Sequence, residues 1–131
     1  MKNMLILLLV MITANSFAQI TSIWKGNTPG HESQWECPSN WSNNRVPDEF
    51  TDVIIQVDIS NDYHYPVFNM SETEINSLRI WPGAYLHLKS GNLFILDAAS
   101  NYFNRSQIVG KGKPVLVDDP QLASNNKKGI N

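Results

Sequence analysis

The middle of the chain repeats short apolar segments that are separated by turn residues. Ile75–Ile80, Ala84–Lys89 and Leu93–Leu96 follow one another at intervals of about eight to ten residues. Pro82-Gly83 separates the first two segments, and Ser90-Gly91-Asn92 separates the last two. None of these segments has the 3.6-residue periodicity of an amphipathic helix. The pattern therefore predicts an all-β domain that is built from many short strands.

Two all-β architectures agree with this spacing. An antiparallel β-sandwich joins its strands by tight hairpins, which favour Asn-Gly or Asp-Gly, and neither dipeptide occurs in the sequence. A parallel β-solenoid instead stacks short strands through corner turns around a column of inward aliphatic side chains. The pairs with the required alternate spacing are Leu78/Ile80, Leu86/Leu88 and Leu93/Ile95. We therefore predict a short parallel β-solenoid (β-helix), with an antiparallel β-sandwich as the alternative.

Further elements follow from the same alternation. Thr51–Ile59 is the clearest strand, because its odd-numbered apolar residues share one face. Tyr65–Phe68 and Gln107–Val117 are predicted to be shorter or weaker extended segments, interrupted by proline or glycine. Ser71–Asn76 has a serine cap with a glutamate three residues later, which predicts a single helical turn.

The first 18 residues have the three-part layout of a secretory signal peptide. Lys2 supplies a positive end, Met4–Ile12 is an uninterrupted apolar run, and Ser16 and Ala18 are small residues at the spacing that signal peptidase requires. The apolar run is roughly half of the about 20 residues that a membrane-spanning helix needs. We predict a signal peptide at 1–18, an all-β domain at 19–117 and a flexible polar tail at 118–131. The mature protein is expected to be extracellular or on the cell surface, and not in a membrane.

Charge and motif content narrow the function classes. The formal net charge is -2, so nothing in the charge balance favours nucleic acid or an anionic membrane as a partner. The single cysteine, Cys37, has no partner for an internal disulfide and is interpreted as a small buried side chain. No motif for nucleophilic catalysis, phosphate binding or a catalytic metal occurs, so we predict a non-enzymatic protein without a cofactor. The loop Asp58–Asp62 carries oxygen ligands but lacks the glycine and glutamate of a calcium-binding loop, and no metal site is predicted.

A wider arrangement of residues resembles a known group of proteins. It comprises Trp24-Lys25-Gly26, Trp35, Asn40-Trp41-Ser42, Val46-Pro47, Asp52-Val53-Ile54-Ile55, and Ile75–Ile80 running into Pro82-Gly83-Ala84-Tyr85-Leu86. This arrangement is similar to the N-terminal part of the β-helical repeat regions in secreted and cell-surface adhesin-like proteins of Bacteroidetes-type bacteria. The resemblance covers roughly residues 23–96. It implies an extracellular adhesin-like or scaffolding role, usually within far longer chains.

The four tryptophans divide into two groups. Trp24, Trp35 and Trp41 lie in a loop-rich segment and are predicted to cap the N-terminal end of the core. Trp81 shares an outward face with Arg79, and Tyr85 and His87 are predicted to continue that face on the next strand. These four are the candidate ligand-binding residues, although an ordinary solvated sheet face accounts for them too.

The function predicted from the sequence is therefore a secreted structural or adhesion module at the cell exterior. A carbohydrate-binding module is the alternative. The predicted partners are an extracellular polysaccharide or another surface protein.

Overall fold

The computed structural model describes residues 18–60 and 62–117, and within them every regular element longer than three residues is a β-strand. The strands are β1 (Ile20–Ile23), β2 (Thr51–Ile55), β3 (Val67–Ile75), β4 (Ser77–Ile80), β5 (Leu86–Ile95), β6 (Ile108–Val109) and β7 (Lys113–Leu116). Short 3₁₀ helices occur at Pro38–Asn40, Ala98–Ser100 and Arg105–Gln107. The predicted all-β class is confirmed. The predicted signal peptide, apart from Ala18, and the predicted tail lie outside the described residues.

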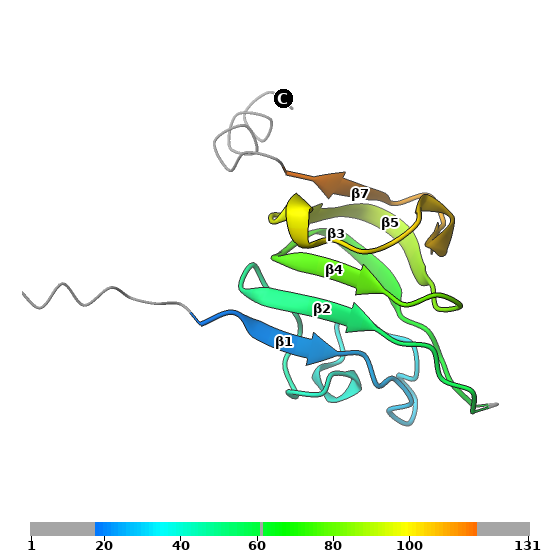
Figure 1. The fold of residues 1–131 in the computed structure, drawn as a ribbon. Coiled ribbons are helices and arrows are strands. Elements are labelled where there is room, and N and C mark those ends of the chain that lie inside the picture. Colours follow the sequence, from blue (N-terminus) through cyan, green and yellow to red (C-terminus); the bar gives the residue numbers. More distant parts are fainter. Residues whose placement is uncertain (1–17, 61, 118–131) are drawn as a thin grey trace, which may run out of the picture.

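The strands form two parallel sheets. One sheet has the order β1-β2-β4, and in the other β5 lies between β3 on one side and β6 and β7 on the other. Every pairing between named strands is parallel, so each return to a sheet adds a strand on top of the previous one (Figure 1). The result is a β-solenoid of about three turns. The solenoid prediction is confirmed, and the alternative of an antiparallel sandwich is wrong.

The strand register explains how the core forms. Val53 pairs with Leu78 and Ile55 pairs with Ile80, while Ile75 pairs with Ile95 in the other sheet. Because side chains alternate between the two faces of a strand, in-register stacking places each inward aliphatic side chain directly above another. The inward side chains of these strands are fully buried. Each buried Leu, Ile or Val contributes about 1.5–3 kcal/mol relative to an exposed position.

One predicted strand ends earlier than expected, because the chain turns a corner of the solenoid. The predicted strand to Ile59 stops at Ile55, and Val57 and Ile59 are 43% and 97% exposed. Alternation continues in the sequence, but the backbone after Ile55 leaves the sheet. Alternation therefore places Val57 and Ile59 on the inward face of a strand, but at these positions the chain is no longer part of the sheet.

Asn76 marks a second corner. The predicted strand at 75–80 is divided there, with β3 ending at Ile75 and β4 beginning at Ser77. The Asn76 amide Nδ2 donates to Asp52 Oδ1 at 2.7 Å, and its backbone N–H donates to the Thr51 carbonyl at 2.9 Å. The helical turn predicted for 71–76 is wrong, since pairing with β5 holds that segment extended.

The segment around Gly91, predicted as a turn between strands, lies inside β5. Gly91 has φ +73°, and a Cβ placed there would lie 1.9 Å from the Met70 carbonyl oxygen. The partner strand β3 shifts register beside Asn69, so both strands bend together while remaining paired. Figure 1 shows the resulting curvature of β5. A glycine is required here because only glycine combines this φ with such a close approach of backbone.

The outer edge of β7 carries a proline. The Val117 N–H donates to the Ile95 carbonyl at 2.9 Å. In a parallel strand the backbone groups of successive residues point to opposite edges, so those of Leu116 and Pro114 face away from β5. Pro114 has no N–H to offer at that edge, which weakens pairing with any further strand.

Candidate functional site

Three tryptophans close the N-terminal end of the solenoid. Trp24, Trp35 and Trp41 are 2%, 0% and 0% exposed. Trp41 lies edge-to-face between the other two, with ring centroids 4.9 Å from Trp24 and 4.8 Å from Trp35. Trp35 then contacts Phe68 of β3 with centroids 5.5 Å apart. Such aromatic pairs add about 0.5–1.5 kcal/mol each beyond the area they bury, so these rings stabilise the fold and offer no face to a ligand.

The indole N–H groups support this structural role. Trp24 Nε1 donates to the His64 carbonyl and Trp41 Nε1 donates to the Trp35 carbonyl, each at 2.7 Å. Among the described residues, Trp35 Nε1 is the buried side-chain polar atom without a hydrogen-bond partner. Its ring is nevertheless enclosed by the edge-to-face contacts with Trp41 and Phe68.

The loop between β1 and β2 also covers strand edges. Ser42 accepts a hydrogen bond from the Ile23 N–H through Oγ and donates its own N–H to the Ile23 carbonyl, both at 2.9 Å. On the other sheet, Val67 donates to the Ser33 carbonyl at 2.7 Å and accepts from the Trp35 N–H at 3.2 Å. The loop therefore satisfies backbone groups on the first strand of both sheets and limits pairing with another chain at this end. Figure 1 shows this loop, coloured cyan, beside β1 at one end of the stack.

Asn40 organises this loop from inside. Its side chain is fully buried, and Oδ1 accepts from the Thr28 N–H at 3.0 Å. Nδ2 donates to the carbonyl oxygens of His31 at 2.6 Å and Gln34 at 3.0 Å. The sequence analysis included Asn40 only as part of a motif. The sequence signal that could have indicated its role in the loop is an asparagine placed directly before a tryptophan that is buried.

The predicted ligand-binding residues are divided between the two sheets. Arg79 lies on β4 and His87 on β5, which belong to different sheets. Trp81 and Tyr85 flank the turn between them, which the Ala84 N–H closes by donating to the Trp81 carbonyl at 3.0 Å. Trp81 and Tyr85 are 49% and 43% exposed. The four residues therefore do not share one sheet face, and only Trp81 and Tyr85 lie at the same turn.

Tyrosines from the preceding turn of the solenoid join this pair. The Tyr65 and Tyr85 ring centroids are 4.4 Å apart, and Tyr63 lies edge-to-face with Tyr65 at 4.9 Å. We call Tyr63, Tyr65, Trp81 and Tyr85 the aromatic corner. Sequence reasoning did not identify Tyr63 and Tyr65 as part of this site. They lie at the corner between β2 and β3, and Trp81 and Tyr85 lie at the equivalent corner between β4 and β5, one turn of the solenoid later.

Hydroxyl groups fix the inner part of the aromatic corner. Tyr63 donates from its hydroxyl to the carbonyl oxygens of Trp24 and Gln56, both at 3.3 Å, and Tyr65 donates to the Gly83 carbonyl at 3.4 Å. Burial raises the pKa of Tyr63 to about 12, with smaller contributions from Tyr65 and from the negative charge of Asp58. Burial also raises the pKa of Tyr65. Both phenols are therefore neutral at physiological pH.

The described surface also contains two shallow grooves outside the aromatic corner. One, of about 350 Å³, is lined by Pro47, Asp48, Glu49, Glu72, Thr73 and Glu74. The other, of about 210 Å³, is lined by Gln19, Thr21, Asp52, Ile54, Ser77, Arg79 and Ser100. Arg79 thus belongs to the outer face of the β1-β2-β4 sheet. His87 lies instead beside Gly110, where an added Cβ would come within 2.9 Å of its ring.

The loop that carries oxygen side chains forms a local turn. Asp58 Oδ1 accepts the Ser60 N–H at 2.8 Å, as in an Asx turn. Over residues 18–60 and 62–117, no group of three His, Cys, Asp or Glu side chains is placed to hold a metal ion. In the same part of the chain, no helix has the length and apolar character that crossing a membrane requires.

Cys37 differs from its sequence-based interpretation. The side chain is partly exposed rather than buried, and its thiol is free. Its Sγ lies 3.3 Å from Ser39 Oγ, and this hydrogen bond is the main cause that lowers the pKa of the thiol below its usual value. The position before the 3₁₀ helix at Pro38, in a surface loop, explains why the side chain does not enter the core.

Comparisons of the chain with family models, with curated protein sequences and with solved structures found no match, so its function is argued from its own geometry.

Proposed function

We propose that this chain is a secreted, non-enzymatic structural or adhesion module that acts at the cell exterior. The observation that carries the proposal is the combination of an N-terminal end sealed by buried tryptophans with lateral surfaces that expose aromatic side chains. Solenoids typically use their lateral surfaces to bind other macromolecules. The signal-peptide layout of residues 1–18 supports secretion.

Secretion and adhesion are tested separately. The full chain is produced in a Gram-negative host, and intact-mass spectrometry is applied to the cytoplasmic, envelope and medium fractions. We expect a product outside the cytoplasm that lacks residues 1–18. The purified product, fluorescently labelled, is then expected to bind bacterial surfaces saturably. Retention in the cytoplasm with residues 1–18 intact would contradict secretion, and non-saturable binding would contradict adhesion.

An enzymatic role makes a different prediction. An enzyme acting on a surface polymer would release soluble product in proportion to time and protein concentration. Incubation of the purified protein with neutral and anionic polysaccharides, followed by a reducing-end assay, is expected to show no release above a heat-inactivated control. Product release would overturn the structural and adhesive proposal.

A carbohydrate-binding module is the second candidate function. It is favoured by the exposure of Trp81 and Tyr85 on either side of one tight turn. Aromatic faces pack against the apolar faces of sugar rings, and two half-exposed rings at one turn offer such faces.

A further inference from the structure

We infer that the aromatic corner binds a neutral polysaccharide, with Trp81 and Tyr85 stacking on sugar rings and the Asp58 carboxylate accepting hydrogen bonds from sugar hydroxyl groups. This inference rests on the second candidate function. It deepens that function by assigning the surface and the charge class of the ligand.

The turn geometry presents the two rings to solvent. Trp81 is the first residue of the four-residue turn that the Ala84 N–H closes, and Tyr85 directly follows the turn. The Ala84 side chain is only 3% exposed. Gly83 has φ +90° and contributes no side chain, and its nearest neighbour is the Val57 side chain. The turn is held by the buried Ala84 side chain and by Gln107 Nε2, which donates to the carbonyl oxygens of Trp81 at 2.8 Å and Ala84 at 3.2 Å, and the rings of Trp81 and Tyr85 stay about half exposed.

Contacts behind Tyr85 fix the position of its ring. Tyr85 packs against Tyr65, and Tyr65 is held between Tyr85 and Tyr63 and by its hydrogen bond to the Gly83 carbonyl. Tyr63 is tied in turn to the Trp24 carbonyl in the N-terminal end of the core. A ring that is already fixed loses little side-chain entropy when a ligand stacks on it, which favours binding.

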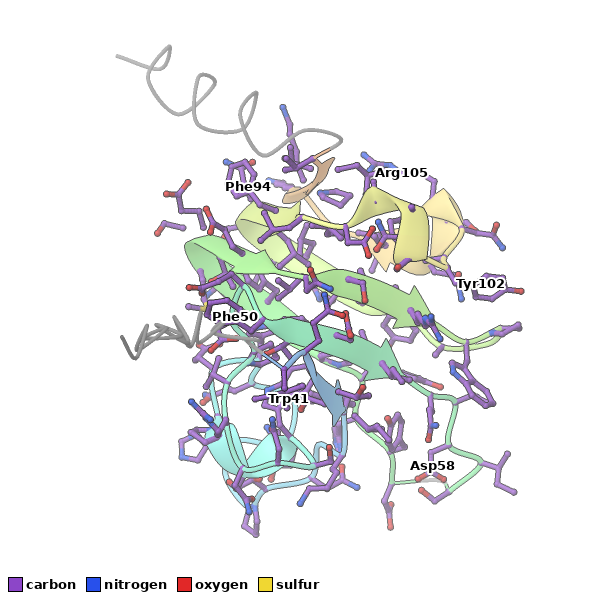
Figure 2. All side chains as sticks on the ribbon, turned by 60° about the vertical axis from the view of Figure 1, so that its left-hand side comes forward. Trp41, Phe50, Asp58, Phe94, Tyr102 and Arg105 are labelled. Carbon is purple, nitrogen blue, oxygen red and sulfur yellow. The ribbon has the colours of Figure 1, made fainter. Side chains whose placement is uncertain are left out.

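The polar surroundings distinguish a sugar from an apolar partner. Asp58 directly follows Val57, whose side chain lies 3.4 Å from the position that a Cβ would take at Gly83, in the turn between the two rings. The Asp58 turn continues to Tyr63, whose N–H donates to the Ser60 carbonyl at 3.4 Å, and the negative charge of Asp58 contributes to the raised pKa of Tyr63. Figure 2 shows Asp58 in the loop that follows β2, at the opposite side of the molecule from Phe50. A pyranose ring has an apolar C–H face and a rim of hydroxyl groups, so rings beside a carboxylate match both parts.

The charge of this carboxylate selects the ligand class. A carboxylate accepts hydrogen bonds from hydroxyl groups but repels the carboxylate or sulfate groups of acidic polysaccharides. The formal net charge of the chain, -2, acts in the same direction. Neutral polymers are therefore expected to bind better than anionic ones.

The experiment is affinity electrophoresis of the purified, processed chain in gels that contain one polymer each. The probes are hydroxyethylcellulose, laminarin and dextran as neutral polymers, and alginate as the anionic one. We expect at least one neutral polymer to retard the wild type. Trp81→Ala and Tyr85→Ala are each expected to weaken that binding by about tenfold or more, while Tyr85→Phe, which keeps the ring, retains it.

Matched controls separate binding from folding. Phe50→Ala removes a 37% exposed aromatic side chain that directly precedes β2, at the end of the strand opposite the aromatic corner, and is expected to bind like the wild type. Asp58→Asn is expected to weaken binding to the neutral polymer and to reduce the discrimination against alginate. Fluorescence of the buried tryptophans confirms that each variant is folded.

The outcomes distinguish the inference from the function on which it rests. If neither a neutral polymer nor alginate retards the wild type, both the carbohydrate-binding function and this inference are wrong. If the wild type binds but Trp81→Ala and Tyr85→Ala bind equally well, the function stands and the assigned surface is wrong. Equal weakening by Phe50→Ala overturns the assignment as well. Stronger binding to alginate than to the neutral polymers overturns the charge class.

Discussion

Replacing Asn40 by alanine tests whether the loop between β1 and β2 depends on one buried amide. The substitution removes three hydrogen bonds to the backbone of Thr28, His31 and Gln34. At about 1 kcal/mol of net stabilisation for each bond, the free energy of unfolding should fall by about 3 kcal/mol. That is a large part of the 5–15 kcal/mol that is typical of a domain.

Urea denaturation followed by tryptophan fluorescence measures this loss directly. Trp24, Trp35 and Trp41 pack in the same loop-rich end, so their emission reports its opening. For a urea dependence of about 1–3 kcal/mol/M, the midpoint should fall by about 1–3 M. A fall in midpoint with an unchanged slope means that the loop and the solenoid unfold together, whereas a shallower slope means that the loop opens first.

Two further variants make the reasoning refutable. Asn40→Asp keeps an acceptor for the Thr28 N–H but loses both donated bonds, so it should destabilise at least as much as alanine without leaving a cavity. Asn69→Ala removes an exposed amide that accepts one bond from Ser90 Oγ and should cost about 0.5 kcal/mol or less. If Asn40→Ala costs no more than Asn69→Ala, the buried amide does not organise the loop and the argument is wrong.

Three other predictions concern the backbone at Gly91, the effect of pH on Tyr63, and the outer edge of β7. Gly91→Ala should lower the free energy of unfolding by several kcal/mol, because the new Cβ would meet the Met70 carbonyl. Gly30→Ala has open space around its Cβ and should lower it by about 1 kcal/mol, from the positive φ alone. Equal shifts in melting temperature for the two variants would contradict this prediction. The pKa of Tyr63 is raised to about 12 in the folded state, so its contribution to stability is complete below pH 10 and is lost between pH 10 and 12. Urea midpoints measured across that range should therefore fall less steeply for Tyr63→Phe than for the wild type, and parallel curves would exclude this cause. Pro114→Thr restores an N–H to the outer edge of β7 and should therefore increase self-association with rising protein concentration, measured as molar mass by light scattering. An unchanged molar mass at all concentrations would show that the proline does not protect the edge.

The candidate site was only partly predictable. Exposure of Trp81 and Tyr85 followed from alternation and from the Pro-Gly turn between them, and both are exposed. Their grouping with Arg79 and His87 did not hold, because the turn carries the chain from one sheet to the other. The contribution of Tyr65 was not predictable, since it depends on which turn of the solenoid lies directly beneath Tyr85.

The sequence by itself determined the all-β class, the inward column of aliphatic residues and the buried tryptophan segment, because alternation and turn residues are local properties of the chain. Tertiary structure alone decided where each strand stops, since Val57, Ile59 and Asn76 occupy corners that alternation does not reveal. It also decided that Asn40 would be buried and that Cys37 would not, although both lie in the same polar loop. The physical reason for the strand ends is that stacking partners are 20 or more residues apart in the chain, as the bond from Asn76 to Asp52 illustrates. The burial of Asn40 depends instead on how the loop between β1 and β2 closes around its amide, which no local sequence pattern reveals.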